Sequence, residues 1–219
     1  MTDMQPDPRR TVAAAALNDL QQQFGGIDIY FFDQLLRGRI RPGMRVLDAG
    51  CGSGRNLVYL LRAGYEVFAA DADPDAIDVV RGLALRLAPA LSADNFRHES
   101  IERMSFPDFS ADVVISSAVL HFAMSDVHFE EMLRGSWRPV KAGGMLFCRL
   151  ASSIGIEGEI EAIEGRRCRL PDGSDRYLVD EPLLMALTRE LGGELLDPIK
   201  TTVVQGQRAM TTWVVRRRC

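Results

Sequence analysis

Residues 46–56, with the sequence VLDAGCGSGRN, constrain the fold of this chain more than any other stretch. The apolar residues before Asp48 are typical of a buried strand, and the pattern after Asn56 is typical of an amphipathic helix. Gly50, Gly52 and Gly54 lie between the two segments, and glycine lets a ligand approach the backbone closely. In open α/β sheets, such a loop lies in the crevice where ligands bind. The stretch therefore predicts a ligand-binding loop; a tight turn that only packs helix against strand is the alternative.

The rest of the chain alternates between strand-like and helix-like segments, which sets the fold class. Strands are expected at 44–48, 65–71, 95–100, 111–119, 145–152, 194–204 and 210–217. Only a short link joins the last two, so they are predicted to be antiparallel. We predict an α/β fold with a doubly wound, mostly parallel seven-stranded sheet, an antiparallel last strand and helices on both faces. An Asp-Gly pair at 172–173 predicts a hairpin inserted near 156–180.

The first 43 residues are too few to form a core of their own. Residues 11–37 are predicted to be helical, with a break at Gly25–Gly26, and they carry the aromatic run Tyr30–Phe32. We expect residues 1–43 to form a helical lid, hinged at the two glycines, on a core of residues 44–219. Plain core packing of a covering helix is the alternative interpretation.

Composition and charge argue against several classes of protein. The net charge is −4, so the chain has no overall basic footprint for nucleic acid. Its four cysteines include no Cys-x-x-Cys pair, so no zinc, redox dithiol or other metal site is expected. No stretch approaches the ~20 apolar residues of a membrane span, and the first residues lack an apolar signal core. We expect a cytoplasmic protein with reduced thiols and no membrane partner.

The glycine spacing and two acids narrow the choice of ligand. A dinucleotide fingerprint requires glycine at the position of Arg55, and no lysine of a nucleoside-triphosphate loop follows. This disfavours a nicotinamide-dependent oxidoreductase. Asp48 would repel a pyrophosphate but attract an ammonium group, and Asp71, at the end of the next strand, can accept hydrogen bonds from ribose hydroxyls. The combination predicts a nucleoside joined to an amino acid, unless Asp71 serves only the helix-capping run with Asp73 and Asp75.

Four motifs in order, VLDAGCGSG, VFAAD, ADVVISSAVLHF and WRPVKAGGMLF, resemble those of class I S-adenosylmethionine-dependent methyltransferases from about residue 44 to the C-terminus. GSGRN followed by LLRAGYEV is similar to small-molecule members such as tellurite-resistance and thiopurine methyltransferases. The resemblance implies S-adenosylmethionine as cofactor, S-adenosylhomocysteine as product, and no metal. It places Asp48 near the methionine amino group and Asp71 at the ribose. At the adenine it places Ser100, where the family often has an acid, with Glu99 or Glu102 as the alternative. The cofactor-binding residues it implies are Asp48, Gly50, Cys51, Gly52, Gly54, Asn56, Asp71, Ala72, Ser100, Ile101, Ser116 and Ser117.

The sequence indicates a class of acceptor rather than a particular one. Methyl transfer from a sulfonium is an in-line displacement, in which the protein mainly positions the reactants. His121 is the candidate general base, with a structural histidine as the alternative. Tyr30, Phe31, His121 and Phe122 are candidates for contacts with the acceptor. The Asn/Asp-Pro-Pro-aromatic tetrad of base-amine methyltransferases is absent, so we expect a small-molecule acceptor and no nucleic acid. A methyltransferase-like protein without turnover, and a nucleic-acid or protein methyltransferase, are the alternatives.

Overall fold

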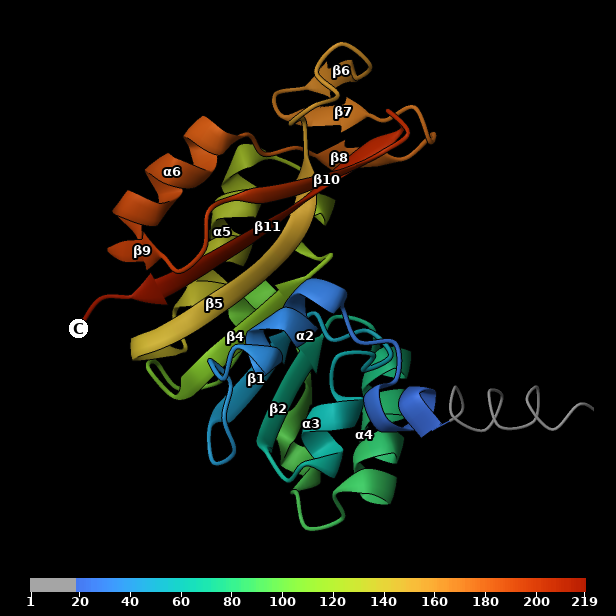
Figure 1. The fold of residues 1–219 in the computed structure, drawn as a ribbon, viewed down its shortest axis with the longest axis vertical. Helices are drawn as coiled ribbons and strands as arrows, with labels where there is room; N and C mark the ends of the chain where they lie inside the picture. Colours follow the sequence, from blue (N-terminus) through green and yellow to red (C-terminus); the bar gives the residue numbers. More distant parts are fainter. Residues whose placement is uncertain (1–18) are drawn as a thin grey trace, which may run out of the picture.

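The computed structural model describes residues 19–219, and their main β-sheet is mixed, with helices on both faces (Figure 1). The strands of this sheet are β1 (Arg45–Ala49), β2 (Glu66–Asp71), β3 (Phe96–His98), β4 (Ala111–Ser117), β5 (Val140–Ser152), β9 (Gly193–Leu195), β10 (Lys200–Val204) and β11 (Arg208–Arg217). Their order is β10-β11-β5-β4-β1-β2-β3, and β9 pairs with β11 beside this path. β11 runs antiparallel to β5, and the pairs among β1 to β5 are parallel. This confirms the predicted fold class.

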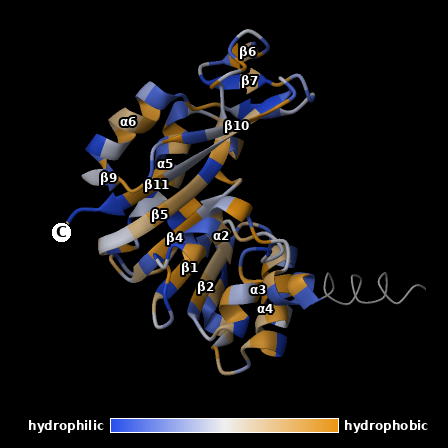
Figure 2. Ribbon diagram, in the orientation of Figure 1, coloured by the Kyte–Doolittle hydropathy of each residue, from blue (hydrophilic) through white to orange (hydrophobic). Residues whose placement is uncertain are grey.

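Two separate apolar cores lie on the two faces of the sheet. The helices are α2 (Ile29–Leu36), α3 (Val58–Arg62), α4 (Pro74–Leu87), α5 (Asp126–Trp137) and α6 (Glu181–Glu190). Phe31 of α2 belongs to one core, and Phe129 of α5 and Leu184 of α6 belong to the other. Adjacent residues of β1, Val46 and Leu47, enter opposite cores, as the period of two in a strand requires. Figure 2 shows hydrophobic residues concentrated in the central strands.

The strand expected at 194–204 is divided into β9 and β10, which gives the sheet eight strands rather than seven. Both halves pair with β11, so the predicted antiparallel pairing is confirmed. The interruption contains Pro198, which has no backbone N–H to donate to a neighbouring strand. Asp197 beside it accepts hydrogen bonds from Arg39 and Gln34, so this part of the chain is bonded to the N-terminal segment instead.

β1 is the point at which the chain reverses its direction across the sheet. It pairs with β2 on one side and with β4 on the other. Loops after strands on the two sides of such a point diverge and leave a crevice at the carboxyl ends of the strands. The glycine loop follows β1 directly, so it lies at the edge of this crevice.

The N-terminal segment packs against the same region of the sheet. Residues 19–24 are helical, Gly25 turns the chain with φ +62°, and α2 follows. A Cβ on Gly25 would lie 2.7 Å from a methyl carbon of Val58, so only glycine fits against α3 here. The expected helix break at Gly25–Gly26 is therefore present, whereas residues 1–18 of the proposed lid lie outside the described residues. Within residues 19–219, no helix is both long and apolar enough to cross a membrane.

Between β5 and α6 the chain forms a second small sheet at one end of the molecule (Figure 1). Its antiparallel strands are β6 (Glu161–Glu164), β7 (Arg167–Arg169) and β8 (Asp175–Tyr177). The Asp172–Gly173 pair lies in the turn between β7 and β8, where the sequence indicated a hairpin. β6 was not expected, because all four of its residues are exposed and the strand has no buried apolar face to mark it.

Candidate cofactor site

The loop after β1 has the backbone that its glycines require. Gly50, Gly52 and Gly54 have φ values of +82°, +50° and +77°. A Cβ on Gly50 would lie 2.6 Å from both methyl carbons of Val119, and one on Gly54 would lie 3.0 Å from a methyl carbon of Val80. A Cβ on Gly52 would meet no atom within 4 Å. Gly50 and Gly54 therefore allow close packing of the protein itself, whereas Gly52 leaves space free beside the loop.

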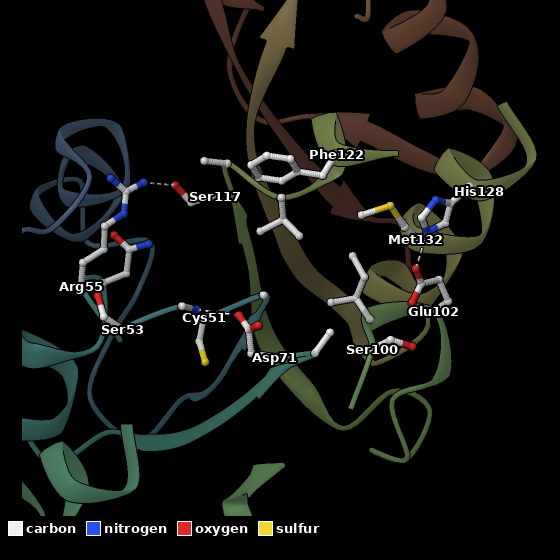
Figure 3. A pocket seen from close by; sticks show the side chains of 17 residues that line it. Cys51, Ser53, Arg55, Asp71, Ser100, Glu102, Ser117, Phe122, His128 and Met132 are labelled. Carbon is white, nitrogen blue, oxygen red and sulfur yellow. Dashed lines mark hydrogen bonds and ion pairs between the residues drawn. The ribbon is translucent and has the colours of Figure 1, made fainter. Parts of the chain in front are cut away.

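A cavity of about 480 Å³ lies against this loop, at the carboxyl ends of β1, β2 and β4. Figure 3 shows Arg55 and Ser117 at one end, Glu102 and His128 at the other, and Asp71 between them. The structure brings ten of the residues implied by the sequence into its wall: Gly50, Cys51, Gly52, Asn56, Asp71, Ala72, Ser100, Ile101, Ser117 and Phe122. The wall also contains Glu102, the alternative to Ser100 at the adenine, and residues that the sequence did not indicate as ligand contacts: Ser53, Arg55, Ala118, Val119, His128 and Met132.

Asp71 fixes the shape of the loop as well as facing the cavity. Its Oδ2 accepts a hydrogen bond from the backbone N–H of Gly52 at 2.8 Å, and its Oδ1 accepts one from Asp73 at 3.0 Å. Each carboxylate oxygen has a further lone pair, so both can also accept from hydroxyl groups. Asp71 therefore offers the paired acceptors that two ribose hydroxyls need.

Asp48 lies beneath the loop and not in the cavity wall. The residue is 1% exposed, and its Oδ2 has no hydrogen-bond partner within residues 19–219. Burial raises the pKa of this carboxyl from its usual value near 3.8 to about 7, with a further rise from Asp71 and an opposing effect of Arg55. An unpartnered acid under the loop fits a positively charged group bound above it.

Arg55 and Ser117 close one end of the cavity. The Nη2 of Arg55 donates a hydrogen bond to the Oγ of Ser117 at 3.0 Å, although 62 residues separate them in the chain. From the sequence alone, Arg55 was evidence only against a dinucleotide ligand. No local pattern indicates this contact, because it forms only when β1 and β4 lie side by side.

Glu102 and His128 form the opposite end of the cavity. The Nδ1 of His128 accepts from the backbone N–H of Met124, so its Nε2 carries the proton that points to Glu102 Oε1 at 2.5 Å. Burial raises the pKa of Glu102, but hydrogen bonds from its own backbone N–H, Ser100 and His128 outweigh it and hold the pKa below the usual value. The pair therefore places an ionised, polar edge beside Ser100.

His121 does not suit the role of general base that the sequence suggested. It is 6% exposed and does not line the cavity. Its Nδ1 accepts a hydrogen bond from the backbone N–H of Ala151 at 3.2 Å, so the proton of the neutral ring is on Nε2. Burial, with a contribution from Arg176, lowers the pKa of His121 to about 4. At neutral pH the ring has no free lone pair to accept a proton, which corrects the prediction.

Several other candidate residues lie outside the cavity wall. Phe31 is fully buried and packs edge-on against Phe147, so it contributes to the core and does not reach an acceptor. Tyr30 shares a hydrogen bond of 2.5 Å with Thr202, and its ring lies near the side chain of Arg149. Gly54 and Ser116 are also outside the wall. Within residues 19–219, no cluster of three or more metal-ligating side chains is present.

Comparison with known proteins relates part of the chain to methyltransferases. Residues 47–148 match a family described as "Methyltransferase domain". A solved structure of 1,6-didemethyltoxoflavin-N1-methyltransferase from Burkholderia thailandensis, with S-adenosylhomocysteine bound, shares the fold with a TM-score of 0.65 at 17% identity, over 100% of this chain and 94% of that one. Residues 47–148 therefore resemble a methyltransferase domain, and the chain shares the fold of this solved methyltransferase.

Its relatives have diverse stated functions. The chain is 33% identical over 140 residues to a ubiquinone biosynthesis O-methyltransferase of Methylocella silvestris. The aligned region covers 62% of this chain and 50% of the relative. It is 29% identical over 192 residues to a tRNA U34 carboxymethyltransferase of Methylococcus capsulatus. That aligned region covers 82% of this chain and 54% of the relative. The chain thus spans about half the length of these relatives.

Proposed function

We propose that the protein transfers a methyl group from S-adenosylmethionine to a small-molecule acceptor. The observation that carries this proposal is the arrangement of two acids at the cavity. Asp71 faces the space above the glycine loop, and Asp48, whose Oδ2 has no hydrogen-bond partner within residues 19–219, lies beneath the loop. We orient the cofactor so that Asp71 holds the ribose and Asp48 stabilises the ammonium group of the amino-acid half. Ser100 and Glu102 border the adenine, and Arg55 and Ser117 lie at the amino-acid end.

Methyl transfer requires the protein mainly to position the cofactor and the acceptor. The bound cofactor supplies a methyl group on a positively charged sulfur, which is already an activated leaving group. The residues of the cavity wall hold the cofactor so that the methyl carbon faces the acceptor. Because His121 offers no free lone pair, we propose that the acceptor atom arrives unprotonated or loses its proton to solvent.

A small acceptor is favoured over a nucleic acid by charge and motif. The chain has a net charge of −4, and the motif after β4 lacks the tetrad that holds a flipped base. The similarity of GSGRN to tellurite-resistance and thiopurine methyltransferases supports the same class of acceptor. The relative named for tRNA U34 is the specific reason to include RNA in the test.

Binding is tested first, by calorimetry with S-adenosylmethionine, S-adenosylhomocysteine and NAD. Binding of the first two without NAD supports the proposal, and binding of NAD alone would overturn it. Turnover is then tested with a labelled methyl group against small thiols, amines, carboxylates and metalloid oxyanions, with bulk tRNA as the competing acceptor. Label on RNA alone would contradict the small-molecule acceptor. Cofactor binding without label on any acceptor would favour a methyltransferase-like protein without turnover.

A further inference from the structure

Asp28 lies behind the cavity wall and caps α2. Its Oδ1 accepts hydrogen bonds from the backbone N–H groups of Tyr30 at 2.9 Å and Phe31 at 3.4 Å. Its side chain is 1% exposed, and the residue does not line the cavity. Asp28 can therefore affect a bound molecule only through the residues that it contacts.

The contacts of Asp28 converge on one end of the cavity. Its Oδ2 lies 2.9 Å from Arg149 Nη1 and 3.7 Å from Arg55 Nη2, and it accepts from Ser117 Oγ at 3.4 Å. Its backbone N–H donates to Asn56 Oδ1 at 2.9 Å. Arg55 also donates to Ser117, as the dashed line in Figure 3 marks. Asp28, Arg55 and Ser117 thus form a closed triangle, and two of its corners are in the cavity wall.

The balance of charge makes this triangle depend on the carboxylate. One buried carboxylate lies between two guanidinium groups, and the Nε of Arg149 has no hydrogen-bond partner within residues 19–219. Without the negative charge, the two cations would repel each other and a buried cation would lose its compensation. The side chain of Arg55 is 43% exposed, so it is the one free to turn away toward solvent.

We propose that Asp28 is a positioning residue that holds Arg55 and Ser117 in place for the amino-acid half of the cofactor. The proposal rests on the cofactor orientation given above. In that orientation Arg55 faces the carboxylate of the amino acid, while the ribose and adenine contacts are made by other residues. Because the same carboxylate caps α2, docking of the N-terminal segment and assembly of this end of the site are coupled.

Two ligands separate this role from a general effect on folding. S-adenosylhomocysteine has the amino-acid half, and 5′-methylthioadenosine lacks it. The variant Asp28→Asn keeps an oxygen for the helix cap but removes the charge. We expect the affinity for S-adenosylhomocysteine, measured by calorimetry on the full chain, to fall at least about tenfold. The affinity for 5′-methylthioadenosine should change less than about twofold, since only remote contacts hold it.

Asp180→Asn is the matched control. Asp180 caps α6 by accepting from Leu183 N, and it lies 3.0 Å from Arg166 Nη1, away from the cavity. This variant should bind both ligands as the unmodified protein does. In an Arg55→Gln background, Asp28→Asn should cause little further loss, because Asp28 acts through Arg55.

The outcomes are distinct. Selective loss of S-adenosylhomocysteine binding, absent in the control, supports the proposal. Equal loss of both ligands, unchanged binding of both, additive loss in the Arg55→Gln background, or failure of Asp28→Asn to fold would each overturn it. If the unmodified protein binds neither ligand, the proposed function fails first, and the result is recognisable without any variant.

Discussion

Asp48 gives the sharpest quantitative prediction, because its carboxyl is buried without a full set of partners. Its pKa in the folded protein is raised from about 3.8 to about 7, mainly by burial. A raised pKa in an acid means that the folded state disfavours the ionised form. The destabilisation is absent below the unfolded-state pKa of about 4 and fully present above pH 7. Each unit corresponds to about 1.4 kcal/mol, so about three units correspond to roughly 4 kcal/mol.

The substitution Asp48→Asn removes this titration with little change in shape. We expect the unfolding free energy of the unmodified protein, relative to that of Asp48→Asn, to fall by up to about 4 kcal/mol between pH 4 and pH 7. Urea unfolding followed by circular dichroism at a series of pH values measures it. Subtracting the two profiles cancels the other acids. Asp78→Asn, on the exposed side of α4, controls for the chemical change itself. Parallel profiles for the unmodified protein and Asp48→Asn would refute the reasoning.

The same carboxyl links cofactor binding to pH. A positively charged ligand favours the ionised form of Asp48, so its binding should release a proton near neutral pH. Calorimetry in buffers of different ionisation enthalpy measures that proton. Affinity should rise as pH increases through 7, and Asp48→Asn should bind more weakly with less dependence on pH. Release of no proton at pH 6.5 would show that the ligand's charge does not reach Asp48.

Four further substitutions test the site. Gly50→Ala should lower the thermal midpoint, because its Cβ would lie 2.6 Å from Val119; Gly52→Ala should cost only about 1–2 kcal/mol of stability but weaken binding of S-adenosylhomocysteine, which thermal melts and calorimetry compare. Asp71→Ala should weaken that binding by about 1–3 kcal/mol, since the ribose acceptors are lost; unchanged affinity would move the ribose elsewhere. His121→Asn, which keeps an acceptor near Ala151 N, should retain turnover and its pH profile; a loss beyond about a hundredfold would restore His121 as a base.

The regular part of the fold could be predicted because its signals are local. Alternating segments, an Asp cap before Pro74 and short links between strands indicate the elements and their order. Two features could not be found in this way. The four exposed residues of β6 have no apolar face, and the split between β9 and β10 depends on Asp197 bonding to the distant Arg39. The split follows from a neighbour that is remote in sequence, whereas β6 is held by pairing with the adjacent β7.

The same distinction separates the predicted part of the site from the missed part. The glycine loop and Asp71 belong to contiguous motifs, so their places at the ends of β1 and β2 could be foreseen. The role of Arg55 could not, because its partner Ser117 comes from β4. For a related reason the sequence left two roles open for His121, general base and structural histidine. Its tautomer is set by the backbone of Ala151, 30 residues away, and nothing in the motif VLHF indicates that bond.

Two buried acids, Asp28 and Asp48, differ in how their negative charge is compensated. Asp28 has guanidinium partners and several donors, whereas an oxygen of Asp48 has none within residues 19–219. The positive charge of Arg55 acts on both acids: its Nη2 is 3.7 Å from Asp28 Oδ2, and it also lowers the pKa of Asp48. A ligand carboxylate that engages Arg55 would weaken the support it gives to Asp48, and a ligand ammonium group would replace that support. A zwitterionic amino acid carries both groups, which is why this end of the cavity fits the methionine half of the cofactor better than a phosphate.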